Sequence, residues 1–433
     1  MDTDIIKLIL DWEGNMKRVS LLVAGYWLLI TGCFVHAGQS EPNDVNSLAD
    51  LSSCLRYAEM HNAALAASFE EWQMAIEQIP QAKALPDPKF TYKLETRRQP
   101  HGQTFGVSQM LPWFGTIEAA TGMASATEQA AQQRYQSQRL KLFSEVKQAF
   151  YDYAFLARQL EIARANLELF RHFEEVARIR YAASQATQPD VIRAQIEIAA
   201  MENEIGNIER FREPVVARLN AILNRSADAP LAWPTQDEFK DVNLNHQQLV
   251  ALLIRNNPQL HAKDFEIAAA QKSLELAKKK FYPQMEVGIE AMYQSEATMG
   301  DGRQPLYATV SFTLPLWRDS YRAGERGAAA QIRKVRQEKT QTQNDLVKDA
   351  QTVLYDYEAA VRKLKLYRDT LIPKTKELLA ASENAYRTGA ADFLSLIDAQ
   401  RKLLEFELLY EEAVKNSRQK LAELEALAGV TFN

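Results

Sequence analysis

The feature that most constrains this chain is an internal repeat, because several short motifs occur twice in the same order. The matched pairs are "DPKFTYKLE" and "YPQMEVGIE", "VSQMLP" and "VSFTLP", "FYDY" and "LYDY", and "YAASQATQPDVIRAQ" and "YRTGAADFLSLIDAQ". Each copy of such a repeat is one structural unit that buries its apolar surface against the other copy. We therefore expect two halves, each with the order helix, strand, loop, strand, long helix, turn, helix.

The repeat also predicts the domain boundaries. The first repeat spans residues 38–225 with a β-hairpin at about 88–112, and the second spans 247–430 with a hairpin at about 283–315. The segment 226–246 contains Pro230 and Pro234, which is typical of a linker.

Two proline-free stretches, from Gly115 to about Ser184 and from Trp317 to about Ile372, predict long helices. A helix of ~70 residues is about 100 Å long. Its apolar side chains recur every three and four residues, and such a stripe needs neighbouring helices to cover it. Shorter helices are expected at roughly 54–84, 190–225, 249–280 and 392–428. Their lengths predict one long helix beside two stacked short ones in each half.

The hairpin segments alternate between apolar and polar residues, which indicates half-exposed β-strands. The apolar sets are Phe90, Tyr92 and Leu94; Met285, Val287, Ile289, Ala291 and Tyr293; and Leu306, Ala308, Val310, Phe312 and Leu314. Strands of about ten residues suit either one face of a soluble sheet or a membrane-spanning β-strand. Aromatic residues near the strand ends, Trp113, Phe114, Tyr282 and Trp317, are typical of a girdle at a membrane interface. Open sheet edges do not occur in lipid, so four membrane strands would need strands from other chains.

The N-terminal segment 1–37 reads as a secretory signal region. Lys17 and Arg18 precede an apolar run that extends to Phe34, and this order is typical of a signal peptide. Met16 fits as a start better than Met1 does. Two endings fit the segment: cleavage after Ala37, or a lipobox in which Cys33 becomes the lipidated first residue.

The composition gives no support to an enzyme or to nucleic-acid binding. The formal net charge is −5, and none of the six histidines lies at ligand spacing from a cysteine cluster or from another histidine. No nucleophile, phosphate-loop or dinucleotide motif is present. We expect no catalytic group, no bound metal and no cofactor.

The double repeat, the paired hairpins, "NPQL" at Asn257 and the two helix turns together resemble the outer membrane factor family, the TolC-like channels. The resemblance covers residues from about Leu51 to Val430. It implies a mainly α fold with a β membrane part. Three chains would form a twelve-stranded outer membrane β-barrel and a periplasmic α-helical barrel.

The resemblance also implies a function in the Gram-negative outer membrane. The expected role is the exit channel of a tripartite efflux pump, in contact with membrane lipid, a periplasmic adaptor and an inner-membrane pump of the RND type. Two alternatives stay open: the channel of a type I protein secretion system, and a periplasmic coiled-coil adaptor. The "LPWFG" turn and the length are similar to the heavy-metal (CzcC/CusC-type) branch, so the cargo is expected to be metal cations or drugs.

Two groups of residues correspond to functional positions of that family. The helix turns would contact the adaptor through Tyr181, Ser184, Asp190, Tyr386, Gly389 and Asp392. Asp398 and Ser395 correspond to acidic positions at the constricted entrance, and only Asp398 is acidic here. The family usually has glycine at Ser184, and an arginine that helps to close the entrance corresponds to Ala391. An alternative for the turn residues is helix capping alone, and for Asp398 an ordinary exposed carboxylate.

Overall fold

The computed structural model describes residues 48–94, 102–235, 241–294 and 305–432. The predicted signal region 1–37, with Cys33 and Ala37, lies outside the described residues, as do the tips of both hairpins.

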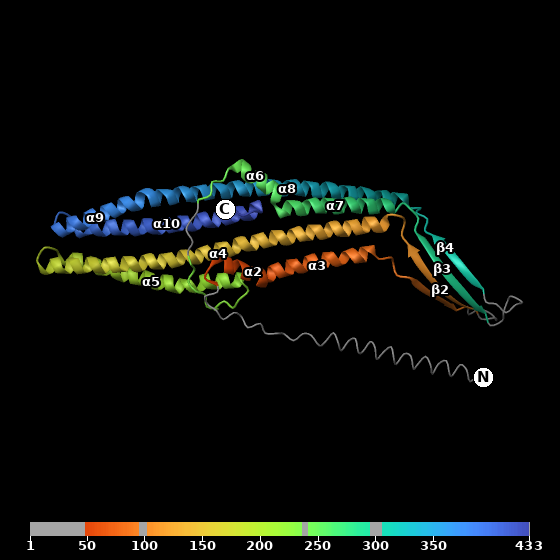
Figure 1. Cartoon of the computed structure of the whole chain (residues 1–433), viewed down its shortest axis with the longest axis horizontal. Coiled ribbons are helices and arrows are strands. Elements are labelled where there is room, and N and C mark those ends of the chain that lie inside the picture. Colours follow the sequence, from red (N-terminus) through yellow and green to blue (C-terminus); the bar gives the residue numbers. More distant parts are fainter. Residues whose placement is uncertain (1–47, 95–101, 236–240, 295–304, 433) are drawn as a thin grey trace, which may run out of the picture. The chain divides into compact units, whose positions relative to one another are not determined.

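The two halves of the chain contain the same series of elements (Figure 1). The first half consists of α2 (Leu51–His61), α3 (Ala63–Lys83), β1 (Lys89–Leu94), β2 (Gly102–Leu111), α4 (Thr116–Ala182) and α5 (Gln188–Ile222). The second half consists of α6 (His246–Asn256), α7 (Pro258–Lys279), β3 (Met285–Gln294), β4 (Leu306–Phe312), α8 (Arg318–Leu366), a π-helical turn η2 (Tyr367–Leu371), α9 (Ile372–Thr388) and α10 (Phe393–Ala428). This order confirms the predicted repeat of a mainly helical chain.

The four strands form one antiparallel sheet in the order β1-β2-β3-β4. The two repeats meet at its centre, where β2 pairs with β3 from Gly102↔Gln294 to Leu111↔Met285. Strand β4 ends at Phe312, before the predicted end at Leu314, although Thr313 N still donates a hydrogen bond to Gln284 O at 2.9 Å. The outer edges of β1 and β4 have no partner strand among the described residues.

One face of this sheet is apolar and exposed. Phe90 pairs with Val107 and Val107 pairs with Ile289, so their side chains lie on the same face. Phe90 is 69% exposed and Leu306 of β4 is 70% exposed. A soluble sheet normally turns such a face toward its core. The described residues of one chain therefore leave this apolar face uncovered.

The opposite face is polar and closely packed. Lys93 Nζ lies 3.0 Å from Glu290 Oε1, and Ser108 Oγ donates to Glu286 Oε1 at 2.6 Å. A side chain at Gly288 would approach the carbonyl oxygen of Val107 to 3.0 Å, so glycine leaves room for the neighbouring strands. Hence the alternation seen in the sequence separates a polar face from an apolar one.

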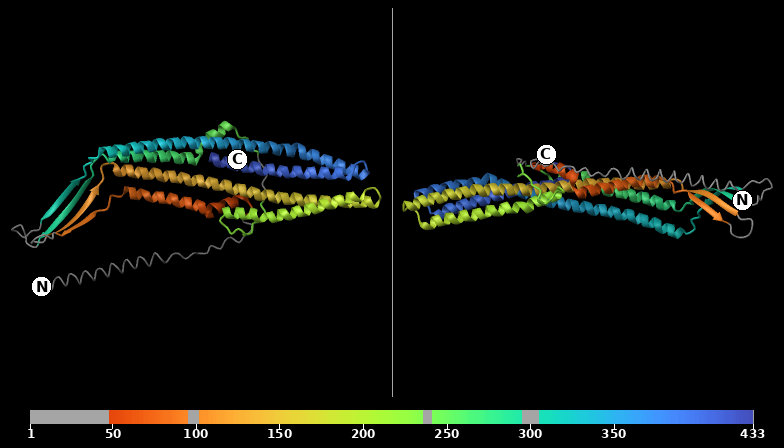
Figure 2. Two further views of the ribbon diagram at one scale, coloured as in Figure 1. Left: turned by 180° about the vertical axis from the view of Figure 1, so that it is seen from behind. Right: turned by 90° about the horizontal axis from the view of Figure 1, so that it is seen from below.

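Each long helix lies beside two shorter helices that are stacked end to end, as the helix lengths predicted. Helix α4 packs against α3 and α5, and α8 packs against α7 and α10. Helix α4 also packs against α7 and α10 of the other repeat. Both views in Figure 2 place the α4–α5 and α9–α10 turns at the end of the helices opposite the sheet. No helix among the described residues is both long enough and apolar enough to cross a bilayer.

An asparagine fixes the joint between the stacked helices in each repeat. Asn62 Oδ1 caps α3 by accepting from Leu65 N, and its Nδ2 donates to Ile222 O at the end of α5 at 2.8 Å. Asn257 Oδ1 caps α7, and its Nδ2 donates to Leu427 O near the end of α10 at 2.8 Å. The "NPQL" asparagine therefore links the start of one helix to the end of another.

The inter-repeat linker is held by the second tyrosine of each "YDY" motif. Tyr153 Oη lies 3.4 Å from Leu231 O. Tyr357 Oη donates to Val242 O and accepts from Val242 N, both at 3.0 Å. The two tyrosines thus attach the linker to α4 and to α8, and burial raises the pKa of both hydroxyls.

The second long helix extends beyond Ile372, where its proline-free stretch ends. Its axis continues through the π-helical turn η2 into α9. Proline offers no N–H and its ring collides with a carbonyl of the preceding turn. A wider π turn placed directly before Pro373 changes the hydrogen-bond register there, so the helix can continue.

Replacing Asn257 by aspartate tests the asparagine joint. The carboxylate of Asn257→Asp can still cap α7, but it cannot donate to Leu427 O, and it is buried beside that carbonyl. We expect a loss of roughly 1–3 kcal/mol, measured as a lower midpoint of thermal unfolding by circular dichroism. Asn245→Asp is the matched control, because Asn245 caps α6 from an exposed position. An equal loss in both variants would contradict the role of the second hydrogen bond.

Candidate functional site: the helix turns and the sheet boundary

The two helix turns have the same backbone geometry, although their sequences differ. Gly389 closes α9 with φ +80°, and Ser184 follows α4 with φ +58°. The next residue in each turn donates back to a carbonyl five positions earlier, Gln185 N to Arg180 O and Ala390 N to Ala385 O, both at 2.8 Å. This is the pattern of a Schellman helix end. Serine therefore occupies a left-handed position that favours glycine.

Acidic residues begin the helix that follows each turn. Asp190 Oδ2 accepts from Thr187 N at 3.1 Å. Pro189 is the second residue of α5. Asp392 Oδ1 accepts from Ser395 N at 3.0 Å and from Ser395 Oγ at 2.6 Å. Hydrogen bonds from Ser395 lower the pKa of Asp392. Ser395 therefore forms part of the α10 cap.

Arg180 connects the two turns within one chain. Its Nη2 donates to Gln185 O at 3.1 Å in the first turn. Its guanidinium lies 4.6 Å from the centroid of the Tyr386 ring in the second repeat. Tyr386 in turn packs against Phe393 at 5.2 Å between ring centroids. Nothing in the local sequence pattern distinguishes Arg180 from other helix arginines, so this contact could not be predicted.

The predicted turn residues differ in exposure. Tyr181, Ser184, Gly389 and Asp392 are exposed, whereas Asp190 is partly buried and the Tyr386 side chain is only 3% exposed. Burial raises the pKa of Tyr386. Its Oη atom is buried and has no hydrogen-bond partner within the described part of the chain. The tyrosine thus supports the turn from inside, while the other residues shape its surface.

Asp398 lies exposed on α10, one turn beyond Ser395. The nearby Arg401 pairs with Glu197 of α5, with 3.2 Å between Nε and Oε2. Hydrogen bonding to Glu197, followed by the charges of Glu197 and Asp398, raises the pKa of Arg401. Within the described ranges, no three His, Cys, Asp or Glu side chains gather closely enough to hold a metal ion.

Three of the four predicted girdle aromatics meet at the boundary between the sheet and the helices. Trp113 stacks on Tyr282 with 5.2 Å between ring centroids and 8° between ring planes. Phe114 packs edge-on against Trp113 at 5.8 Å. Trp317 lies just before α8 and is 79% exposed. The structure thus gathers aromatic rings where the apolar face ends.

The left-handed backbone conformation of Ser184 predicts that glycine at this position would stabilise the first turn. Ser184→Gly removes the cost of placing a Cβ atom at positive φ, so the turn should gain about 1 kcal/mol. Gly389→Ala should lower the opening free energy of the second turn by a similar amount. Hydrogen exchange of the amides at 181–190 and 385–395 measures both local opening free energies.

Ser137→Gly inside α4 is the control for this serine, because glycine within a helix is destabilising by about 0.5 kcal/mol. A lower opening free energy of the first turn in Ser184→Gly would contradict the left-handed conformation of Ser184.

Comparison with known proteins agrees with this architecture. The family model described as outer membrane efflux protein matches residues 55–225 and again 249–430. The cobalt-zinc-cadmium resistance protein CzcC of Cupriavidus metallidurans is 20% identical over 390 residues, which cover 90% of this chain and 92% of that protein.

Solved structures share the fold at low identity. The outer membrane protein VceC from Vibrio cholerae superposes with a TM-score of 0.72 at 18% identity, over 88% of this chain and 97% of that one. The transmembrane channel protein CusC gives a TM-score of 0.74 at 14% identity, over 88% and 92%. Because the family model matches most of the sequence in two copies, the chain belongs to the outer membrane efflux protein family.

Proposed function

We propose that this protein is the outer membrane channel of a tripartite efflux pump and acts as a passive exit duct. Membership of the outer membrane efflux protein family supports a transport role in the outer membrane rather than an enzymatic one. The observation that supports the duct most directly is the four-stranded sheet with one apolar, exposed face. Lipid would cover that face, and the helices would extend into the periplasm.

The open strand edges favour a trimer. Unpaired N–H and C=O groups cost several kcal/mol each inside a bilayer. The β1 edge of one chain can pair with the β4 edge of the next, so three chains would close a twelve-stranded barrel. Lys93, Glu290 and the other polar side chains of the sheet would then line its interior.

Channels of this family work with a periplasmic adaptor and an inner-membrane pump, and we propose a pump of the RND type. The adaptor would contact the exposed residues of the helix turns, Tyr181, Ser184, Gly389 and Asp392. Tyr386 and Arg180 would hold the two turns together from behind. Only the exposed residues are then available to the partner.

Asp398 is the residue we propose at the constricted entrance. Three chains would bring three copies of this carboxylate around one axis, and a ring of carboxylates favours cations. A cation-selective entrance suits the metal cargo in the name of CzcC. Asp392 and Ser395 would cap the start of α10, the helix that carries Asp398.

Planar lipid bilayers test both the channel and its entrance. We expect the purified protein to give stepwise conductance, with a reversal potential that indicates cation selectivity in a salt gradient. Asp398→Asn should shift that potential toward zero, because three carboxylates are removed from the entrance.

Glu405→Gln is the matched control for Asp398. Glu405 lies two helical turns farther along α10, and Lys402 Nζ already pairs with its Oε2 at 2.7 Å. The cation selectivity of the Glu405→Gln channel should equal that of the unmodified protein. Absence of conductance would contradict the channel, whereas equal selectivity in Asp398→Asn and the unmodified protein would contradict the entrance ring alone.

A further inference from the structure

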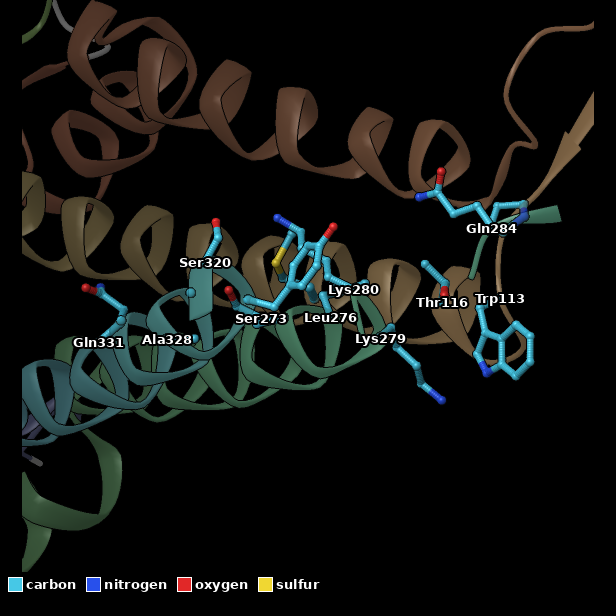
Figure 3. Close-up of a pocket in the computed structure, with 16 residues that line it drawn as sticks. Trp113, Thr116, Ser273, Leu276, Lys279, Lys280, Gln284, Ser320, Ala328 and Gln331 are labelled. Carbon is cyan, nitrogen blue, oxygen red and sulfur yellow. The ribbon is translucent and has the colours of Figure 1, made fainter. Parts of the chain in front are cut away.

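A cavity of about 810 Å³ lies where the sheet joins the helices (Figure 3). It is bounded by the start of α4, the end of α7 and the start of α8. The lining includes Trp113, Ser273, Lys279, Lys280, Gln284 and Ser320. The cavity therefore lies directly beside the aromatic residues at the boundary of the apolar sheet face.

The charge of this cavity is unbalanced. Lys279 and Lys280 both line it, and no acidic residue does. Neither lysine forms an ion pair with any other described residue, and nor does their neighbour Lys278. Two further cavities lined by described residues contain both signs of charge. One has Lys141 with Glu145, Asp349 and Glu423, and the other has Arg158, Arg368 and Lys376 with Glu161, Glu407 and Glu411.

The lysines and the aromatic rings adjoin one another. Lys279 Nζ lies 6.0 Å from the centroid of Tyr282, and Tyr282 stacks on Trp113. A Cβ atom at Gly115, where φ is +75°, would lie 3.1 Å from the same Nζ, so glycine keeps space around this ammonium group. In Figure 3, the Lys279 and Trp113 side chains extend in the same direction. A ligand there would meet a cation beside an apolar ring surface.

We propose that this cavity binds the phosphate-bearing headgroup of an anionic membrane lipid, whose acyl chains continue along the apolar face of the sheet. This inference rests on the proposed function, because it requires the sheet to lie in a bilayer. Lysines near a membrane surface attract anionic headgroups, and tryptophan and tyrosine favour the same depth. Ser273, Ser320 and Gln284 line the same cavity and supply hydroxyl and amide groups to its polar part.

Native mass spectrometry of the full-length protein tests this proposal. The protein is released from vesicles of equal parts phosphatidylglycerol and phosphatidylcholine, and the lipids that stay bound are counted. We expect selective retention of phosphatidylglycerol, which should fall by about five-fold for each lysine removed in Lys279→Gln and Lys280→Gln.

Two further variants separate a lipid site from a general effect of charge. Lys278→Gln removes the same charge from the same helix end but outside the cavity, so retention should not change. The double variant Lys279→Arg with Lys280→Arg keeps both charges and should retain the lipid. Equal retention in the glutamine variants and the unmodified protein would overturn the proposal, as would an equal loss in Lys278→Gln.

Added inorganic phosphate distinguishes the two sources of this anion. Phosphatidylglycerol should remain bound in its presence, and displacement by phosphate would show a site for the free ion and overturn the lipid assignment. Conductance in planar bilayers without selective retention would refute the lipid site and leave the channel standing. Absence of the protein from outer membrane fractions would refute the channel itself.

Discussion

The exposed apolar face of the four-stranded sheet is the constraint on which the rest of this structure depends. Phe90, Val107, Ile289 and Leu306 lie on one face and no described helix covers them, while ion pairs and glycines occupy the other face. In water such a sheet would be an aggregation hazard. In a bilayer, lipid chains would cover the same face, and only the outer edges of β1 and β4 would need partner strands. Both requirements are met when several chains share one barrel.

The helical part supports this sheet by joining the two repeats along their whole length. Strands β2 and β3 pair across the repeat boundary, and α4 packs against α7 and α10 of the other half. A buried polar pair, Asn166 on α4 and Gln400 on α10, adds a specific hydrogen bond at that interface. Such a pair fixes the register of two helices, because sliding would leave buried amides unpaired. The asparagine joints at Asn62 and Asn257 fix the stacked helices in the same manner.

Much of this architecture could be predicted because it follows from local periodicity. Proline-free stretches with an apolar stripe gave the bounds of α4 to within about two residues, and strict alternation identified β1, β3 and β4. Helix capping, the alternative for the turn residues, fits Gly389, which closes α9 with φ +80°. These signals are local, and tertiary contacts did not override them.

The differences arise where contacts between distant segments decide the outcome. Pro373 lies just beyond the proline-free stretch, and the π turn before it lets the helix continue along α10. Ser184 adopts a left-handed conformation that its residue type disfavours, and its turn is held by Arg180. Tyr386 looked like a surface residue of the turn, yet it is buried against Phe393 and Arg180. Local patterns in one sequence contain no information on contacts between residues that lie far apart in that sequence.

Cross-linking of the two sheet edges between chains tests the central claim most directly. Thr91→Cys in β1 and Thr309→Cys in β4 place thiols at the middle of the two open edges, and Cys54 is buried, with its thiol pKa raised to about 12 by burial. Bismaleimide treatment of outer membranes that contain the double variant should give a covalent trimer on denaturing gels, and each single variant should give only monomer. A double variant that stays monomeric, or that gives ladders beyond the trimer, would contradict a barrel shared by three chains.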